Sequence, residues 1–464
     1  MTRPLSLQLA EYAHRLSYDH LDEQTRHEVR RRVIDSFACA LGAHASPVVR
    51  IARKVASRVQ ADPGATYLGS QRKTSPEWAA FVDGILFRYL DYNDTYLSLE
   101  PAHPSDNLAA VLAVAEAVGS SGQNVMTALV LAYEIQCRMC DAASIRARGW
   151  DHVTYGAFST SLAAGKLMGM DVEKLTQTAN IAGTPHVAIR QTRSGELSEW
   201  KGCAFANASR NGVVSALLAN EGLTGPSPLF EGELGFFKQV SGPFELPFLD
   251  QKTPSDFMIN KTSIKFWPAE YHSQSAIHAA LEMRSQLLKQ HPKAPFEELI
   301  ASFDIFSFDA AVDIIGKDPE KWRPKTRETA DHSLPYCTAV ALLDGDVTLA
   351  SFDDNRLNDP RVLKLLDKIK IHRDDELTAR YPRGIPNRLV ATLESGETIA
   401  TENEFPRGHD QNPMTDLEVT AKFQRMANGL MSESAQDQFL ETCWRLDSLT
   451  SVSPLISLFP AEPA

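Results

Sequence analysis

The stretch EVRRRVIDSFACAL, residues 28–41, sets the character of the first half of the chain. Val29, Val33 and Phe37 lie four residues apart, with further apolar residues between them. This spacing is typical of an α-helix that buries one face. The chain therefore opens with the pattern of a helical core.

Helical patterns continue outward from this stretch to about residue 240. Ser75-Pro76-Glu77 places a capping residue before a proline, which is the expected start of a helix that buries Trp78 and Phe81. Further helices are expected at residues 108–118, 125–140, 158–168 and 204–219. Breaks such as GSSGQ and GLTGP separate them. We therefore predict an α-helical first domain that is rich in alanine.

The pattern changes after about residue 260. Residues 300–308 favour a strand, and RLVATLESGETIATENEF, residues 388–405, alternates apolar side chains around Ser395-Gly396 as a hairpin does. Helices are expected at 336–343 and 361–369, and helical spacing returns at 414–446.

The predicted fold is accordingly mainly α. A large all-helical domain uses both ends of the chain, residues 1–260 and 410–464. A smaller α+β domain, residues 261–409, is inserted between them.

Length and charge exclude several classes of protein. The chain has 464 residues and a net charge of -12 with no long basic run, so nucleic acid is not expected as a partner. No run of 18 uninterrupted apolar residues is present, so no membrane span is expected. The opening MTRPLSLQLAEYAHRL lacks the apolar core of a secretory signal, so a cytoplasmic location is expected. Six scattered cysteines favour reduced, packed thiols over disulfides.

The densest polar cluster, residues 88–117, lies between two apolar helices. Its polar residues include Asp91, Asp94, Thr95, His103, Ser105 and Asp106. His103-Pro104-Ser105 leads into the helix near Asn107, whose N-terminus could hold a carboxylate substrate. The alternative is that Ser105 or Asp106 only caps that helix, and that Asp91 and Asp94 cap a turn.

Polar groups interrupt the apolar pattern in four other stretches. These are WDHVTYG with His152, SEWKGCAFANASRNG with Lys201, SIKFWPAEYHSQS with Lys265 and His272, and ADHSLPY with His332 and Tyr336. Each residue taken alone is also compatible with a purely structural role. Together they offer cations, imidazoles and a phenol for chemistry.

Other catalytic templates fit poorly. The chain has no GxGxxG opening a βαβ unit, no GxxxxGK[ST], no HExxH and no GxSxG. Cys137 and Cys140 form a CxxC that could ligate an iron–sulfur cluster with Cys203. They lie in an apolar helical pattern, however, which favours core cysteines.

Five motifs together resemble the MmgE/PrpD family, whose best-known members are 2-methylcitrate dehydratases. They are LDYNDTYLSLEPAHPSDN (90–107), GWDHVTYGAFSTSLAAGKLMGM (149–170), KFWPAEYHSQSAIHAALE (265–282), DHSLPYCTAVALLDG (331–345) and FPRGHDQNP (405–413). The resemblance implies a helical domain made from both chain ends, an inserted α+β lid, a homodimer and a pocket between the domains. It also implies dehydration of 2-methylcitrate, or of a related tricarboxylate, without metal or cofactor.

The resemblance and the chemistry assign roles to ten residues. The catalytic set is His103, His152, Asp91, Lys201 and Tyr336, and the substrate-binding set is Thr95, Lys265, Arg190, Arg193 and His272. Removing a proton beside a carboxylate builds negative charge that fixed cations offset, which suits the lysines. The two catalytic histidines are expected to act as acid and base, and Asp91 to orient one imidazole.

Three alternatives stay open at this level. The same carbanion chemistry serves cis-aconitate decarboxylases and iminodisuccinate epimerases of the same family. A third interpretation, from another class, is a non-catalytic scaffold that binds a metabolite.

Overall fold

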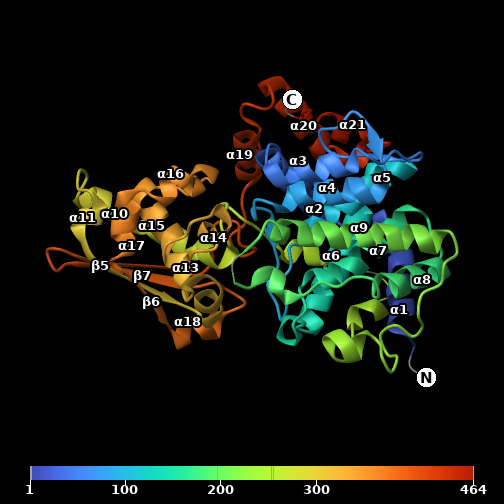
Figure 1. The fold of residues 1–464 in the computed structure, drawn as a ribbon, viewed down its shortest axis with the longest axis horizontal. Helices are drawn as coiled ribbons and strands as arrows, with labels where there is room; N and C mark the ends of the chain where they lie inside the picture. The colour runs from blue at the N-terminus through green and yellow to red at the C-terminus, as the bar shows by residue number, and fades with distance from the viewer. Residues whose placement is uncertain (1–2, 196, 252, 254, 463–464) are drawn as a thin grey trace. The chain divides into compact units, whose positions relative to one another are not determined.

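The computed structural model describes residues 3–195, 197–251, 253 and 255–462 (Figure 1). The chain is mainly α, as the helical spacing predicts. Contacts within the chain divide it into two compact units. The first takes in Met1–Gly195, Glu199–Thr262 and Thr415–Ala464, so far as these residues are described, and the second is built around Ser263–Met414. In the described part of the chain, no helix is both long and apolar enough to cross a bilayer.

The first unit is a bundle of helices. Its main members are α1 (Leu5–Arg15), α2 (Glu23–Ala43), α3 (Pro47–Ala56), α4 (Pro76–Arg88), α5 (Leu108–Val118), α6 (Gly122–Ala142), α7 (Val153–Leu167), α8 (Val172–Ala182), α9 (Trp200–Asn220), α19 (Asp416–Ala427), α20 (Glu433–Trp444) and α21 (Ser453–Ser457). Short strands β1 (Ala65–Thr66) and β2 (Lys73–Thr74) pair antiparallel at its edge. Almost every apolar side chain on α5 and α6 is buried, so these helices lie in the core.

Close helix crossings hold the centre of this bundle, where α9 packs on both α4 and α7. Gly84 of α4 faces Ala206 of α9, and a β-carbon on Gly84 would lie 2.9 Å from the Cα of Ala206. Gly156 of α7 similarly faces the ring of Phe205. The glycines are needed because a methyl group at either crossing would overlap its neighbour.

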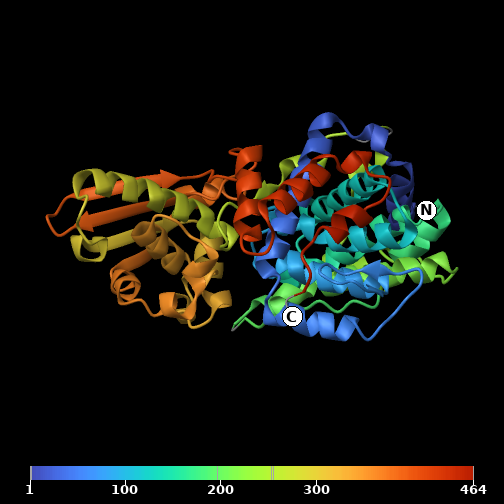
Figure 2. The ribbon, with the colours of Figure 1, turned by 90° about the horizontal axis from the view of Figure 1, so that it is seen from above.

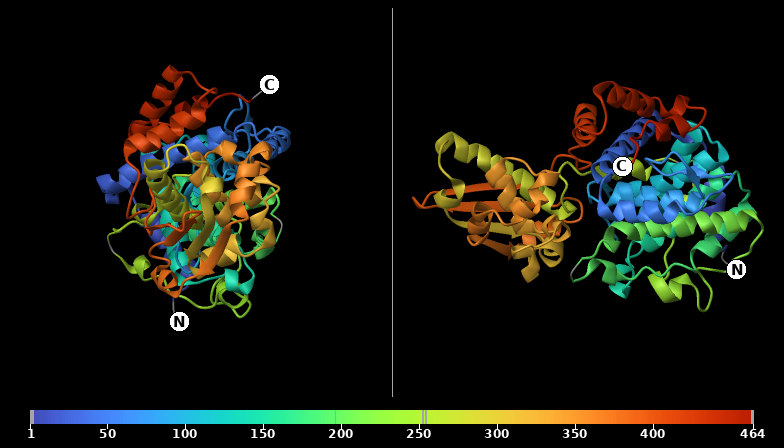
Figure 3. Two further views of the ribbon diagram at one scale, coloured as in Figure 1. Left: turned by 90° about the vertical axis from the view of Figure 1, so that its left-hand side faces the viewer. Right: turned by 45° about the horizontal axis from the view of Figure 1, so that its top comes forward.

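The C-terminal helices pack back on α2. Figure 3 shows α19 and α20, in red, against the blue α2, and contacts join both helices to it. The ring of Phe37 meets that of Phe439 at 4.9 Å between centroids, edge to face. Phe423 of α19 stacks on the same Phe439 at 5.1 Å. Helices α19 and α20 thus complete the core that the first helices begin.

The second unit is built around a four-stranded sheet of order β6-β5-β7-β8. Figure 2 shows strands of this sheet in yellow and orange. The strands are β5 (Ile300–Ser307), β6 (Ile369–Arg373), β7 (Asn387–Leu393) and β8 (Thr398–Asn403). β5 runs parallel to β6, with Phe303 opposite Ile369, and antiparallel to β7. Helix α10 (Gln274–Gln290) packs on β7 and β8, and α15 (Leu334–Asp344) packs on α10. Shorter helices, among them α17 (Pro360–Leu366) and α18 (Asp375–Arg380), complete the unit.

Most of the elements predicted from spacing are confirmed. The helix predicted at 108–118 has those bounds, the helix at Pro76 begins where its cap indicates, and β7 and β8 form the predicted hairpin. Several bounds are wrong. α7 begins at Val153 rather than 158, because Val153-Thr154-Tyr155-Gly156, the second part of the WDHVTYG stretch, already forms its first turn. The helix predicted to reach 369 ends at Leu366, because Ile369 pairs with β5 as the first residue of β6.

Gly84→Ala should lower the free energy of unfolding by about 1–3 kcal/mol, because the added methyl has no room against Ala206. The clash outweighs the gain of about 1 kcal/mol in helix propensity. Thermal or urea unfolding followed by circular dichroism measures it. Val214→Ala, on the exposed side of α9, is the control, with an expected change within about 0.5 kcal/mol. Equal stability of the two variants would contradict a tight crossing.

Candidate active site

A buried ion pair joins the end of α4 to the start of α9. Lys201 Nζ donates to Asp91 Oδ2 at 3.0 Å, and Arg88 donates to Asp91 Oδ1 at 2.5 Å. Asp91 itself has φ of +50°, in the left-handed region that residues other than glycine seldom adopt. This turn directs the Asp91 carboxylate at Lys201 across the α4–α9 crossing, so the pair depends on both backbone and packing.

His103 is held with a defined tautomer. Its Nδ1 lies 2.8 Å from the carbonyl oxygen of Asp94 and 3.2 Å from the hydroxyl of Thr95. Since a carbonyl oxygen only accepts, Nδ1 carries the proton, and Nε2 is the basic nitrogen of the neutral ring. The sequence-predicted pair of Thr95 and His103 is therefore brought together.

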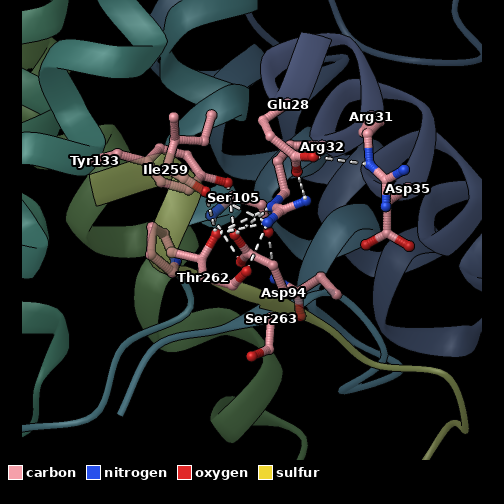
Figure 4. Close-up of polar contacts among 12 residues, drawn as sticks. Glu28, Arg31, Arg32, Asp35, Asp94, Ser105, Tyr133, Ile259, Thr262 and Ser263 are labelled. Atoms are coloured by element: carbon pink, nitrogen blue, oxygen red, sulfur yellow. Dashed lines mark hydrogen bonds and ion pairs between the residues drawn. The ribbon is translucent and has the colours of Figure 1, made fainter. Parts of the chain in front are cut away.

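The Asp94 side chain fixes the loop that carries His103, and Figure 4 shows it among Ser105, Tyr133 and Arg32. Its Oδ1 accepts the backbone N–H of Ser105 at 2.9 Å, and its Oδ2 accepts the hydroxyl of Tyr133 at 2.6 Å. The guanidinium of Arg32 lies 3.7 Å from the same Oδ2. Burial raises the pKa of Asp94, and Arg32 with these hydrogen bonds opposes the rise.

This contact occupies part of the anion site expected before the helix at Asn107, which stays a prediction. A 3-10 turn, residues 104–107, runs directly into α5, and the protein's own Asp94 carboxylate takes the Ser105 N–H. Neither Ser105 nor Asp106 caps α5 through its side chain. Asp94 therefore acts as a cap for this turn, whereas neither Ser105 nor Asp106 caps α5.

His152 stands beside His103, with 5.8 Å between ring centroids. It is the last residue before α7 and is buried, and its Nδ1 has no hydrogen-bond partner among the described residues. Burial, together with the charges of Arg193, Arg88 and Arg190 and against the opposing effect of Asp151, lowers the pKa of His152 to about 3. The ring is therefore neutral at physiological pH.

The positive charges of three arginines thus act on His152. Arg193 binds Asp151 with its Nε 2.9 Å from Oδ2, and Arg190 N donates to Gly149 O at 2.8 Å. The backbone around Trp150 and Ile189 forms an antiparallel bridge, which brings the arginine segment to the start of α7. Arg88 also binds Asp91 together with Lys201, so positive charge acts on both His152 and Asp91, an environment suited to a polycarboxylate.

Asp106 adds a carboxyl that sequence reasoning did not assign to the site. Its Oδ1 accepts from Asn93 at 2.7 Å, and its Oδ2 lies 3.7 Å from Arg88 Nε. Burial raises the pKa of Asp106 to about 7, while Arg88 lowers it and Asp94 raises it. Arg88, which bridges Asp91 and Asp106, was also missed. Its place one helical turn before Asp91 is the signal that could have found it.

Lys265 and His272, both predicted to bind substrate, gather around Glu270 in the second unit. His272 donates from Nδ1 to Glu270 Oε1 at 2.7 Å, and its backbone N–H donates to Oε2 at 2.8 Å. Burial would raise the pKa of Glu270, but His272, then His332 and Lys265, lower it to about 2. Glu270 is a second residue that the sequence analysis did not assign.

Tyr336 lies within the second unit, on α15. Its hydroxyl donates to the carbonyl oxygen of Ser351 at 2.7 Å, and its side chain is fully buried. Burial raises the pKa of Tyr336 well above its usual value. The phenol proton of Tyr336 is therefore engaged in a hydrogen bond inside this unit.

The cysteine pair lies inside α6. Cys137 and Cys140 are buried, and burial raises the pKa of each thiol well above its usual value. The interpretation as core cysteines is therefore favoured. In the part of the chain that the structure describes, no three His, Cys, Asp or Glu side chains are grouped so as to hold a metal ion.

The first unit thus presents a buried polar site with a tautomer-fixed histidine, a neutral histidine and converging cations, as an enzyme acting on small polycarboxylates requires. The chain belongs to the MmgE/PrpD family: its N-terminal domain matches residues 7–249 and its C-terminal domain residues 267–447. The C-terminal match extends past the second unit into α19 and α20 of the first.

Individual relatives carry related names. A 2-methylcitrate dehydratase of Cupriavidus necator is 30% identical over 84% of this chain and 85% of its own length. The 2-methylcitrate dehydratase of Escherichia coli K12 is 30% identical over 81% of this chain and 80% of its own. A fungal alkylcitrate dehydratase is 29% identical over 92% and 88%, respectively.

His152 should stay uncharged at pH 5, with imidazole ¹⁵N shifts of a neutral ring. Its pKa falls from 6.5 in the unfolded chain to about 3 on folding. Below pH 6.5 the unfolded chain therefore binds a proton that the folded protein does not. His152 makes the protein less stable as pH falls toward 3, by about 1.4 kcal/mol per pH unit. His152→Gln should remove this slope, and parallel stability curves for the two proteins would contradict it.

Proposed function

We propose that the protein is a hydro-lyase that dehydrates a citrate-type tricarboxylate, with 2-methylcitrate as the first candidate and 2-methylaconitate as its product. The names of its relatives support the reaction class. The observation that carries the proposal is the buried, neutral His152, which feels the charges of three arginines and lies beside the tautomer-fixed His103. A polycarboxylate supplies the negative charge that these arginines attract.

His103 is the base. With Nδ1–H donated to the Asp94 carbonyl, Nε2 takes the proton from the carbon next to a substrate carboxylate. The negative charge that spreads onto that carboxylate is stabilised by Lys201, whose ammonium Asp91 holds at 3.0 Å. Asp91 therefore orients Lys201.

The leaving hydroxide needs a proton. His152 cannot provide it as an imidazolium, because its pKa of about 3 keeps it neutral. The imidazolium formed on His103 returns the proton, so carbon loses a hydrogen and a hydroxyl group, a double bond forms, and water leaves. The buried Nδ1 of His152 accepts the hydrogen bond of the substrate hydroxyl and orients the leaving group.

The remaining predicted residues take supporting roles in this proposal. Arg190 and Arg193 bind a substrate carboxylate, and Lys265 and His272 form a further carboxylate-binding group. Thr95 steadies the His103 ring. Tyr336 has a structural role, because its hydroxyl is engaged with Ser351. The homodimer implied by the resemblance and the cytoplasmic location expected from the opening residues stay predictions.

His103→Ala should lower kcat by about 10² to 10⁴-fold with little change in affinity, because the base acts only when the proton moves. Lys201→Ala should weaken binding as well, since its charge meets the carboxylate before and during the reaction. Single-turnover dehydration and calorimetric affinity measure both effects. His14→Ala, exposed on α1, is the control and should leave both unchanged. Near-normal turnover of His103→Ala would exclude this site.

The substrate is tested with purified protein and four compounds: 2-methylcitrate, citrate, cis-aconitate and iminodisuccinate. Ultraviolet absorbance follows formation of the double bond, released carbon dioxide reports decarboxylation, and chiral chromatography reports epimerisation. The highest kcat/KM should be for 2-methylcitrate. Carbon dioxide release from cis-aconitate, or epimerisation without dehydration, would assign the chain to another reaction of the family. Binding without turnover of any compound would favour the metabolite-binding scaffold.

A further inference from the structure

Helix α2 carries two charged side chains on its buried face. Arg32 is 3% exposed and Asp35 is fully buried, three residues apart among apolar neighbours such as Val33. Burying a charge is costly unless other groups compensate it. The partners of these two residues therefore show what the charges do.

Arg32 reaches the loop that holds His103 (Figure 4). Its guanidinium donates to the Thr262 carbonyl at 2.7 Å and to Glu28 at 2.8 Å. These contacts fix its position, and from there it lies 3.7 Å from Asp94 Oδ2. The carbonyl oxygen of the same Asp94 accepts the Nδ1–H of His103. Arg32 thus acts on His103 through one intervening residue.

Asp35 reaches the Asp91 turn from the same helix. Its Oδ1 lies 2.6 Å from Nζ of Lys422, which belongs to α19. That ammonium donates to the carbonyl oxygen of Tyr92 at 2.7 Å and lies 3.6 Å from the centroid of the Tyr92 ring. Tyr92 directly follows Asp91, whose φ of +50° requires support from its surroundings. Asp35 therefore acts on Asp91 through Lys422.

We propose that Arg32 and Asp35 are positioning residues for the active site. Arg32 sets the orientation of His103 through Asp94. Asp35, through Lys422, maintains the left-handed turn at Asp91 that holds Lys201. The inference rests on the proposed function, because it assigns these two anchors to the base and to the cation of that reaction. If Arg32 and Asp35 only stabilised the fold, replacing either one would instead impair His103 and Lys201 equally.

Crossed double-mutant cycles in kcat/KM separate these roles. Arg32→Met should lower kcat/KM about 10- to 100-fold in the parent and much less when His103 is already Ala, because its effect passes through that imidazole. Its effect should persist in Lys201→Ala. Lys422→Met should behave in the opposite way, losing its effect in Lys201→Ala and keeping it in His103→Ala.

Matched variants keep the test valid if a single substitution fails to fold. Lys422→Met combined with Asp35→Asn removes both charges of the buried pair, and Arg32→Lys keeps the charge while losing the planar guanidinium. Lys166→Met is the control. Lys166 is a mostly buried lysine that donates to the Ala13 carbonyl at 2.8 Å, near the end of α7 opposite His152. It should lower stability without lowering kcat/KM.

Hydrogen exchange in the ligand-free protein gives a readout that does not depend on the substrate. Amides of residues 89–95 should exchange at least about 10-fold faster in the Lys422→Met, Asp35→Asn protein than in Lys166→Met. The inference would be overturned if the effects of the two substitutions on kcat/KM multiply in both cycles and the amides of residues 89–95 exchange at an unchanged rate. Absence of dehydration by the parent protein, with the exchange difference present, would overturn the proposed function and leave the positioning of Asp91 supported.

Discussion

The pairing of Asp91 with Lys201 is the interaction on which the site depends. It joins opposite charges that are both buried at the α4–α9 crossing, where Arg88 shares the Asp91 carboxylate with Lys201. The close approach of the two helices at Gly84 and Ala206 makes this pairing geometrically possible. The charge pairing in the site therefore depends on the close packing of the helices in the bundle.

The two neighbouring imidazoles, His103 and His152, have different electrostatic surroundings. His103 is tied through Nδ1 to a backbone carbonyl, which leaves its other nitrogen as the basic one. His152, 5.8 Å away, is kept neutral by burial and by the surrounding arginines. Groups of one chemical type thus acquire different tasks from their surroundings, as acid–base chemistry at neutral pH requires.

The fold was predictable to the extent that local spacing encodes it. Periodic apolar residues placed α5 with its observed bounds, and Ser395-Gly396 placed the β7–β8 hairpin. The helix predicted to reach 369 ends earlier, because Ile369 pairs with a strand, β5, that lies more than sixty residues before it in the sequence. In the site, the histidines and lysines were proposed from sequence. Arg88, Asp106 and Glu270 were not, because charged residues are usually solvated, and only the burial of Arg88 and Asp106 and the 13% side-chain exposure of Glu270 mark them as different.

The sequence by itself determined the helices, the hairpin and the polar segment around His103, since backbone geometry gives each element a short period that neighbouring residues must match. Tertiary structure alone decided which charges meet. Lys201 reaches Asp91 across 110 positions of sequence, and Lys422 reaches Tyr92 across 330. It also decided that Asp94, rather than a ligand, takes the N–H of Ser105. The physical reason is that the partner of a buried charge is set by the packing of whole helices, which no local pattern records.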